Sequence, residues 1–501
     1  MLSSPPVTRV LHVPSGTALP ATPIRLAPND WILPQHMSIG LLHFYAKPAA
    51  AKESEFMSPD ALATSLEQLL AHYPLLAGRF VRNAAEGTLE IDTLDAGCTF
   101  LTARTEARIE DLPLDEGRFT GTRALPYSLQ LMPPFDYAAP TSGPILSVQH
   151  TRFACGGVSL GVQLHHYVGD MQSFVQMMGD WTHLHRALQA GEASPALPQP
   201  PTLDRSLFNR ISAEDIARHL QGHTELTHKL KDAAPAADAS STATAAAPAA
   251  GSTPISRCFR FQPDELARLK QAASSSSGQW VSTFEALAAH LCRATFRARH
   301  PEMLGGDAAS KEPFASKIYV ATNWRSRLRD PPCPPRYFGN AALYTSLHFP
   351  DSAAALLAPA SSLSDTAAAV HNAVAANSGV AQWRTMAWIS AQADKEQIEP
   401  AFDLDRRDFA VTSWLKFGMH DAAQFEHGQR PLRICLPPFP GMHGIAILFP
   451  TPEEGPLAEG AARAGGIAPS PAPEAPVDVL LGLSEEQMER LERDAEFRKF
   501  R

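Results

Sequence analysis

Alternating apolar and polar positions open the most informative stretch of the chain, residues 144–188. The alternation predicts a strand, Gly156-Gly157 predicts a turn, and residues 158–164 predict the returning strand of a hairpin. From Met171 onward the apolar residues recur at helical spacing instead. His166 therefore stands where a strand opens into a loop, a position that is rigid and can face a cleft.

Four positions after His166 comes Asp170, in the run HHYVGD. A neutral imidazole can take a proton from an attacking hydroxyl or amine, which typically accelerates such a reaction by about 100- to 10,000-fold. The aspartate could either orient the ring or turn away and brace the loop. The spacing alone is weak evidence, because His228 and Asp232 repeat it in a polar, helix-like stretch. The hairpin, the doubled histidine and the apolar strand favour the first copy.

Elsewhere the apolar pattern predicts short strands and amphipathic helices. Residues 39–45 form an apolar run typical of a buried strand, and the helix after it is predicted to be capped by Ser58 and to end before Pro74. Ser282 and Glu285 have the spacing of a capping box at the start of another helix. Further strands are expected at 318–321, 409–414, 444–449 and 477–481, and further helices at 211–231, 361–377, 380–393 and 484–497.

The chain of 501 residues is too long for one ordinary core, so two domains are expected. We divide it into an N-terminal domain at 1–200, a crossover at 201–254 and a C-terminal domain at 255–501. Two Pro/Ala-rich segments, 233–253 and 451–475, have too little bulk to bury and are interpreted as insertions.

Composition excludes several classes of function. The net charge of −9 provides no overall positive field for a nucleic acid. The six cysteines contain no C-x-x-C pair, so neither a disulfide framework nor a metal site is expected. The first residues lack the pattern of a signal peptide, and no apolar run approaches the roughly 18 residues of a membrane span. A soluble, cytoplasmic protein is the expectation.

HHYVGD after an apolar strand resembles the H-x-x-x-D-G motif of the BAHD acyltransferases, the plant and fungal CoA-dependent transferases. Other segments resemble the same family in the same order along most of the chain. They are PLLAGR at 74–79, S-x-x-E-x-L-x-A-H at 282–290, R-x-R-L at 325–328, the Gly339-Asn340 turn, T-S-W at 412–414, and the strand and helix at 477–497.

The resemblance implies an α/β fold of two similar chloramphenicol-acetyltransferase-like domains, each a mixed β-sheet with flanking helices, and an active-site tunnel at their interface. It implies that a monomer transfers an acyl group, acetyl or hydroxycinnamoyl-like, from acyl-CoA to a small-molecule alcohol, phenol or amine, without a bound cofactor or metal. His166 would be the general base and Asp170 its structural partner. The acceptor would meet His165, Thr412, Trp414 and Tyr45, CoA would meet Ser282, Thr283, Asn323 and Arg325, and an oxyanion donor is expected near Thr412 or Ser413.

Two motifs depart from the family pattern. Met171 stands where the family has the glycine of H-x-x-x-D-G, and Gly169 is the candidate to absorb part of that backbone bend. The second family signature, D-F-G-W-G, survives only in part. Phe425, Gly428 and Pro431 are in register, whereas Gln424, Glu426 and His427 are changed. Because family members pair that aspartate with an arginine, Arg325 or Arg327 is expected to lack its partner.

Two alternatives remain open on sequence alone. The doubled histidine of H-H-x-x-x-D also marks the condensation domains of peptide synthetases, which take carrier-protein thioesters. The two damaged motifs would also suit a non-catalytic binding protein on an acyltransferase scaffold. Release of free thiol from acetyl-CoA in the presence of acceptors separates both from the CoA-dependent enzyme.

Overall fold

The computed structural model describes the protein over most of its length. The described residues are 2–32, 37–112, 122–123, 130–136, 139–209, 211–212, 214, 216–217, 228–230, 254–274, 280–304, 316–329, 331–349, 362–392, 395, 398–400, 403–404, 407–426, 428–437, 443–452 and 475–501. The predicted insertion at 233–253, and all but the ends of the one at 451–475, lie outside them.

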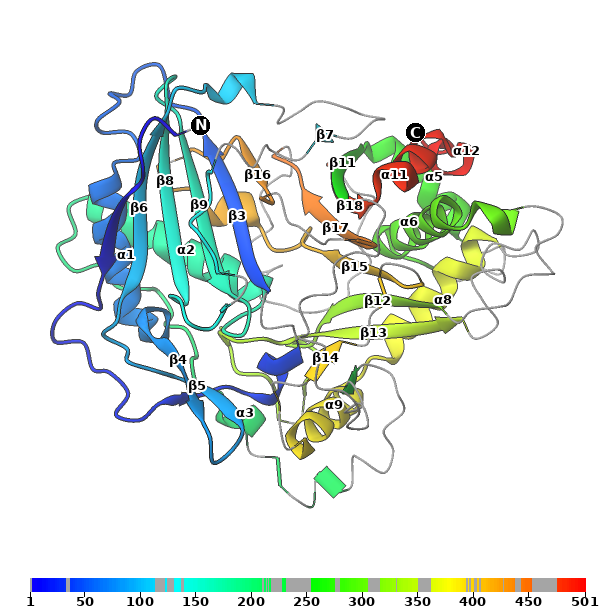
Figure 1. Ribbon diagram of the computed structural model, residues 1–501, viewed down its shortest axis with the longest axis horizontal. Helices are drawn as coiled ribbons and strands as arrows, with labels where there is room; N and C mark the ends of the chain where they lie inside the picture. Colours follow the sequence, from blue (N-terminus) through cyan, green and yellow to red (C-terminus); the bar gives the residue numbers. More distant parts are fainter. Residues whose placement is uncertain are drawn as a thin grey trace, which may run out of the picture.

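Two halves lie side by side, each built on a mixed β-sheet with helices on one face (Figure 1). The N-terminal half has a six-stranded sheet in which only the central β6 and β8 run parallel. In spatial order its strands are β1 (Val7–Leu11), β6 (Cys98–Thr105), β8 (Leu146–Phe153), β9 (Val158–His165), β3 (Ser38–Tyr45) and β16 (Arg433–Cys435).

The C-terminal half has a seven-stranded sheet with a parallel centre, where β12, β15 and β17 run in one direction. In spatial order its strands are β13 (Ala342–Phe349), β12 (Ser316–Asn323), β15 (Phe409–Ser413), β17 (Ile445–Pro450), β18 (Val477–Leu483), β11 (Ile255–Phe261) and β7 (Thr122–Arg123). Two small sheets complete the fold, one of β2 (Ile24–Arg25), β5 (Thr88–Asp92) and β4 (Arg79–Asn83), the other of β10 (His228–Leu230) and β14 (Ile398–Pro400).

Helices cover the outer faces of both sheets. In the N-terminal half α1 and α2 pack on the sheet, and in the C-terminal half α5, α6, α8 and α11 do so. The described helices are α1 (Pro59–His72), α2 (Met171–Gln189), α3 (Ser206–Asn209), α5 (Pro263–Ala273), α6 (Thr283–Arg299), α8 (Leu363–Ala376), α9 (Gly379–Ala391), α10 (Met419–Ala422), α11 (Glu485–Arg493) and α12 (Ala495–Arg498). None of them is long and apolar enough to cross a membrane.

Each half lends an edge strand to the other. β16 from the C-terminal part of the chain pairs with β3, and β7 from the N-terminal part pairs with β11. The segments 1–200 and 255–501 are therefore interlocked by backbone hydrogen bonds. Each sheet therefore ends in a strand from the other half of the chain.

The central hairpin is confirmed: β8 and β9 pair antiparallel around Gly156, which has the left-handed φ of +80°. The helix predicted after it is α2, whose apolar stripe of Phe174, Met177, Met178 and Trp181 is at most 1% exposed. Burying each such side chain contributes about 1.5–3 kcal/mol. The stripe anchors α2 against the sheet, and with it the loop that carries His166.

Two local predictions were wrong. Ser58 precedes α1, but its side chain makes no capping hydrogen bond, so Pro59 at the first turn is the stronger start signal. Residues 228–230, predicted as helix, form strand β10 paired with β14. The second H-x-x-x-D thus begins on a strand, and its aspartate, Asp232, lies outside the described residues. Other predicted elements, including β15, β17, β18, α8 and α9, are confirmed within a few residues.

Candidate active site

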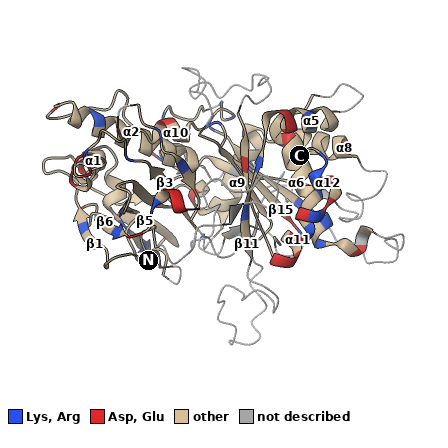
Figure 2. Ribbon diagram, turned by 90° about the horizontal axis from the view of Figure 1, so that it is seen from above, with Lys and Arg blue, Asp and Glu red and all other residues tan. Residues whose placement is uncertain are grey.

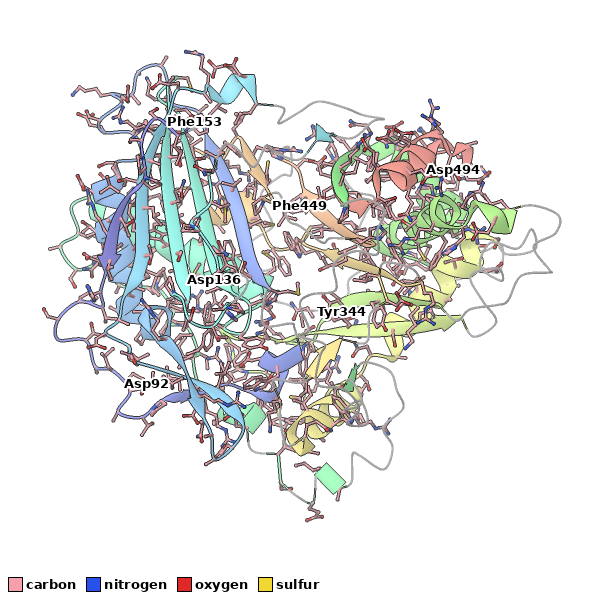
Figure 3. All side chains as sticks on the ribbon, in the orientation of Figure 1. Asp92, Asp136, Phe153, Tyr344, Phe449 and Asp494 are labelled. Atoms are coloured by element: carbon pink, nitrogen blue, oxygen red, sulfur yellow. The ribbon has the colours of Figure 1, made fainter. Side chains whose placement is uncertain are left out.

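A cavity of about 890 Å³ lies between the two sheets, with walls from both halves of the chain. The N-terminal wall is the open face of β3, β9, β8 and β6, crossed by residues 130–135. Figure 3 locates Tyr344 on β13, where side chains occupy the space between the halves. The C-terminal wall includes Asn323, Asn340, Tyr344, Thr412, Ser413, Trp414, Phe417 and Ile447. The expected site between two domains is therefore present as a real volume.

His166 lies in the wall of this cavity, immediately after β9, and is partly exposed to it. Its Nδ1 is enclosed and has no hydrogen-bond partner among the described residues, which leaves Nε2 as the nitrogen available to a ligand. Burial lowers the pKa of His166 below its usual 6.5, although its own carbonyl, Asp170 and Asn340 act in the opposite direction. The ring is therefore neutral at pH 7, the form that a general base requires.

Asp170 turns away from the imidazole and braces the loop. Its Oδ1 accepts from Ser173 N at 3.0 Å as the N-cap of α2, and its Oδ2 accepts from Ala341 N at 2.8 Å. Arg325 adds a two-pronged ion pair, with Nη1 at 2.7 Å and Nη2 at 3.0 Å from the two carboxylate oxygens. Burial alone would raise the pKa of Asp170, but Arg325 and the two backbone N–H groups lower it overall. Of the two roles open on sequence, the brace is the one the geometry supports.

The expectation that Arg325 binds CoA is corrected by this arrangement. Its terminal nitrogens are occupied inside the protein, by Asp170, by Ser173 Oγ at 3.0 Å and by the Gly339 carbonyl at 2.8 Å. In place of the aspartate of D-F-G-W-G, both arginines have other partners, and Arg325 pairs with Asp170. Arg327 donates to the carbonyl oxygens of Val374 and Asn377 at 2.8 and 2.7 Å.

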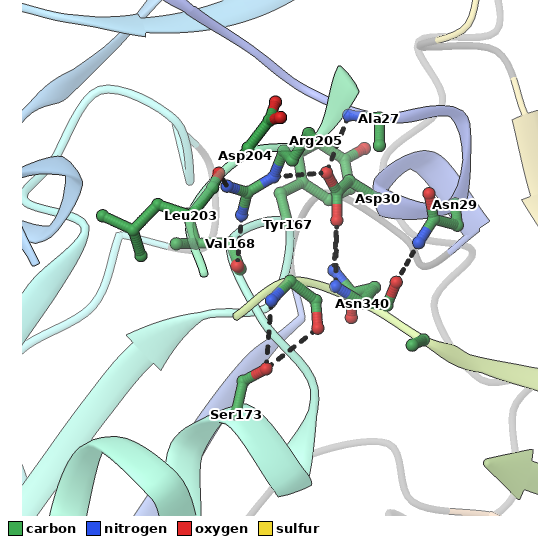
Figure 4. Close-up of polar contacts among 12 residues, drawn as sticks. Ala27, Asn29, Asp30, Tyr167, Val168, Ser173, Leu203, Asp204, Arg205 and Asn340 are labelled. Atoms are coloured by element: carbon green, nitrogen blue, oxygen red, sulfur yellow. Dashed lines mark hydrogen bonds and ion pairs between the residues drawn. The ribbon is translucent and has the colours of Figure 1, made fainter. Parts of the chain in front are cut away.

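A second buried acid–base pair holds the same loop from the other side (Figure 4). Asp30 and Arg205, at most 2% exposed, form an ion pair at 3.0 Å, and Arg205 also donates to the Val168 carbonyl at 2.7 Å. Asp30 Oδ1 accepts from Asn340 Nδ2 at 3.0 Å, and that amide donates in turn to the His166 carbonyl at 2.8 Å. The backbone of His166 is thus tied to two buried ion pairs contributed by both halves.

We expect Asn340→Ala to lower kcat about tenfold while KM for acyl-CoA stays within a factor of two. The substitution removes the amide that joins Asp30 to the His166 carbonyl, so the imidazole loses one support but keeps its chemistry. The free energy of unfolding should fall by about 1–3 kcal/mol, the cost of leaving buried partners unpaired. Steady-state kinetics and urea denaturation measure both.

Asn377→Ala is the matched control for this variant. Asn377 is also buried, 6% exposed, and its side chain also contacts protein groups, namely Thr345 and Gln382, but it does not line the cavity. It should lose stability without losing kcat. Equal losses of kcat in the two variants would contradict a positioning role for Asn340.

The replacement of the motif glycine by Met171 causes no steric problem. Asp170 is the N-cap, with φ −87° and ψ −177°, and Met171 simply begins the helix. Gly169 is the position that needs a glycine, because a Cβ there would lie 2.8 Å from Ser173 Cβ. The position that requires a glycine is therefore Gly169, two residues before the glycine position of the family motif, and helix α2 still begins at Met171.

The residues predicted to meet the acceptor divide into two groups. Thr412 and Trp414 line the cavity. Asn323, which was predicted to meet CoA, also lines it, and its side-chain amide donates to the side-chain oxygen of Gln172, another lining residue. Tyr45 does not line the cavity: it is 1% exposed on the helix side of β3, where its hydroxyl donates to the Ala423 carbonyl at 2.8 Å. The prediction for Tyr45 was wrong because a period of two places it opposite Gly40 and Leu42.

His165 does not line the cavity either, so its prediction as an acceptor-binding residue was wrong. Its ring is 2% exposed and packs against Phe80, Tyr167 and Phe135 with centroid distances of 4.6, 5.1 and 6.3 Å. Its Nδ1 accepts from Tyr167 N at 3.2 Å, so it shapes the turn that follows β9. It borders a separate hollow of about 30 Å³ and not the main cavity.

Ser282 and Thr283 open α6 as predicted, with a complete capping box. Ser282 Oγ accepts from Glu285 N at 3.2 Å, and Glu285 Oε2 accepts from Ser282 N at 2.6 Å. Neither Ser282 nor Thr283 belongs to the described lining of the cavity. Their contact with CoA stays a prediction.

The damaged D-F-G-W-G segment packs on the far side of β3, away from His166. Phe425 is 1% exposed, with edge-to-face contacts to Trp181 at 4.7 Å and Tyr45 at 6.2 Å between centroids. Glu426 Oε1 accepts from Met57 N at 3.1 Å, and Gly428 has a φ of +74°. The changed residues thus have local structural partners, apart from His427, which lies outside the described residues.

Two groups of residues at the site escaped sequence reasoning. Asp30, in a short 3-10 helix, and Arg205 stand far apart in the sequence, and no spacing rule joins them. Gln149 and Gln163 carried a usable signal, because polar residues at alternate positions of two strands had to share one sheet face. In the described residues no group of three His, Cys, Asp or Glu side chains could hold a metal ion.

Comparison with known proteins gives the same assignment over nearly the whole chain. Residues 12–498 match the model described as "Transferase family". The shikimate O-hydroxycinnamoyltransferase of Nicotiana tabacum is 30% identical over 401 residues, or 79% of this chain and 82% of that protein. The putrescine hydroxycinnamoyltransferase 1 of Oryza sativa subsp. japonica is 28% identical over 475 residues, or 88% and 92%.

Solved structures share the fold at lower sequence identity. Vinorine synthase superposes with a TM-score of 0.65 at 18% identity, over 99% of this chain and 97% of its own. The F. graminearum TRI101 structure with coenzyme A and T-2 mycotoxin gives a TM-score of 0.69 at 17% identity, over 96% and 99%. The family match, the relatives and the shared two-sheet fold lead to one conclusion: the chain belongs to the Transferase family, the BAHD acyltransferases.

Proposed function

We propose that this acyltransferase moves an acyl group from a CoA thioester to a hydroxyl, or to an amine, of a small molecule in the interdomain cavity, with His166 as the general base. The observation that carries the proposal is the placement of His166: a neutral imidazole in the wall of a cavity built by both halves, with Nδ1 enclosed and Nε2 available. Asp170 and Asn340 act through the backbone, as positioning residues.

The reaction follows from this placement. Nε2 takes the proton of the acceptor hydroxyl or amine while that atom attacks the thioester carbonyl, which becomes a tetrahedral oxyanion. When the carbon–sulfur bond breaks, the imidazolium returns the proton to the leaving thiolate, so the products are acylated acceptor and free CoA. Holding both reactants in one cavity supplies attack geometry that collision in water rarely provides.

The oxyanion requires a hydrogen-bond donor. Thr412 and Ser413 line the C-terminal wall and carry hydroxyls, so we propose that one of them serves. For the acyl group, acetyl or hydroxycinnamoyl-like, the aromatic lining by Phe135, Tyr344, Trp414 and Phe417 supports a planar aromatic acyl chain. The relatives named as hydroxycinnamoyltransferases support the same choice.

The test is a thiol-release assay. Purified protein is mixed with acetyl-CoA, p-coumaroyl-CoA or, in parallel, an acyl carrier-protein thioester, and with sets of alcohol, phenol and amine acceptors. Free thiol is followed with a thiol reagent. Release that depends on an acceptor, with the acylated product found by mass spectrometry, is the expected result. Binding of ligands without release from any donor would favour the non-catalytic scaffold, and release only from carrier-protein thioesters would favour a condensation-type enzyme.

A further inference from the structure

We propose that the acceptor of this enzyme is an uncharged alcohol or phenol, bound through its hydroxyl groups by the side-chain oxygens of Gln149 and Gln163. The inference rests on the proposed acyl transfer and goes beyond it, since it names the class of acceptor and two residues that select it. Three independent features of the cavity support it.

The first feature is the orientation of the two glutamine amides. Gln149 Nε2 donates to the Gln130 carbonyl at 2.6 Å and to Thr151 Oγ1 at 3.1 Å. Because a carbonyl can only accept, the amide nitrogen of Gln149 must face it and the oxygen must point elsewhere. Gln163 Nε2 donates to Ser38 Oγ at 3.0 Å. Both residues line the cavity.

Neither amide oxygen accepts a hydrogen bond from the described residues, and neither is enclosed as a buried atom without a partner. The Gln130 carbonyl thus fixes the Gln149 oxygen as an acceptor, and the Gln163 oxygen is an acceptor in the orientation in which Nε2 donates to Ser38 Oγ. An oxygen of this kind recognises an O–H or neutral N–H donor, and it offers no charge to balance an ammonium or a carboxylate.

The second feature is the sheet register that brings the two glutamines together. Gln149 faces Gly161 on β9, and Gln163 faces Gly40 on β3. The absent side chains admit Met132: a Cβ on Gly161 would lie 3.0 Å from the Met132 sulfur, and one on Gly40 would lie 3.1 Å from its methyl carbon. The two amides are thus set against an apolar methionine, as suits a hydroxylated but largely apolar ligand.

The third feature is the charge of the cavity. In the described lining, the side chains that ionise near neutral pH are His166 and Asp170, and Arg325 already neutralises Asp170. By contrast, Figure 2 shows acidic and basic residues side by side on α11 and α12, at the outer end of the C-terminal half.

Among the described lining residues, a charged acceptor finds no free counter-ion, and burying an unpaired charge is expensive. Shikimate is a carboxylate and putrescine a diamine, so the acceptors named for two relatives both carry charge away from the reacting group. The described lining of this cavity suits a neutral acceptor better than either of those molecules.

Matched acceptors test the proposal. Shikimate and its methyl ester carry the same hydroxyl groups and differ in the charge of the carboxyl group and in one methyl group, as do 3-(4-hydroxyphenyl)propionate and its methyl ester. Thiol release from acetyl-CoA and p-coumaroyl-CoA gives kcat/KM for each. The ester should exceed its acid by at least tenfold in a pair that reacts. Equal values, or a preference for the acid, would overturn the proposal while leaving acyl transfer intact.

Variants then assign the selection to the glutamines. Gln149→Leu and Gln163→Leu should each raise KM for the ester about fivefold to tenfold with little change in kcat. Gln176→Leu is the control: Gln176 donates to Tyr73 and Arg336 outside the cavity, so its loss should leave KM unchanged. If both cavity variants keep the wild-type KM, with thermal melting showing that they fold, the assignment fails.

Failure of the proposed function remains distinguishable. If the wild-type enzyme acylates neither member of any pair, calorimetric titration of the same acids and esters into wild-type protein still measures selection. Tighter binding of the esters, weakened by Gln149→Leu, supports a neutral ligand site in a protein without transferase activity. Equal binding of acid and ester overturns the further inference as well.

Discussion

Replacing His166 by alanine should reduce kcat for acyl transfer by about 100- to 10,000-fold, the usual contribution of a general base. KM for acyl-CoA should change little, because in the proposed reaction the imidazole meets the acceptor proton and not the bulk of the donor. The melting temperature should also stay close to that of the wild type, since the ring lies at a cavity wall and is only partly buried. Steady-state thiol-release assays at saturating acceptor and varied acyl-CoA concentration give kcat and KM for acyl-CoA.

The adjacent histidine provides the control. His165 accepts a hydrogen bond from Tyr167 N and lies in an aromatic cluster, so His165→Asn, which retains an acceptor near the position of Nδ1, should keep kcat within about tenfold of the wild type. If His165→Asn abolished transfer and His166→Ala did not, the assignment of the base would be reversed.

Replacing Asp170 by asparagine should have the largest effect on stability, a loss of about 3–5 kcal/mol in the free energy of unfolding. The substitution leaves Arg325 with its charge uncompensated, although its side chain is only 12% exposed. Activity should fall as well, because the same carboxylate joins the start of α2 to Ala341, next to Asn340. Urea denaturation followed by tryptophan fluorescence measures the first effect and thiol release the second.

Asp180 on the same helix is the matched control for Asp170. It pairs with Arg336 and Tyr73, but Arg336 is more exposed, at 27%, and neither partner lines the cavity. Asp180→Asn should therefore cost less stability and leave kcat unchanged. An Asp170→Asn protein as stable as the Asp180→Asn protein would show that the Asp170–Arg325 pair does not brace the loop.

The strands and the helix around the site could be predicted because the spacing of apolar residues within each segment determines them. The hairpin at 146–165 and helix α2 follow from a period of two that changes to a helical period at Met171. The motif HHYVGD then placed His166 at a strand end, where the structure has it. Both helix starts were predicted at the right residue. At Ser282 the side chain forms the expected cap, whereas at Ser58 it does not and Pro59 provides the signal.

Contacts between distant segments could not be predicted in the same way. Strands β7 and β16 each pair with the sheet of the other half through backbone hydrogen bonds, and the pattern of apolar and polar side chains does not reveal such a pairing. Tyr45 and Arg325 were predicted to meet ligands because their segments border the site. Tyr45, however, lies on the face of β3 that is turned away from the cavity, and Arg325 is held by Asp170. The place of Gln149 in the cavity wall could not be predicted either, because the cavity depends on residues 130–135 crossing the sheet and on the C-terminal half of the chain.

The most direct test of the central claim is the pH dependence of acyl transfer in the wild type and in His166→Ala. Only the neutral imidazole can accept a proton, and burial lowers the pKa of His166 below 6.5. Activity should therefore be full above that lowered pKa and fall on acidification, with a midpoint below pH 6.5. The residual rate of His166→Ala should show no such decline. A wild-type midpoint above 6.5, or the same acidic decline in His166→Ala, would contradict His166 as the base.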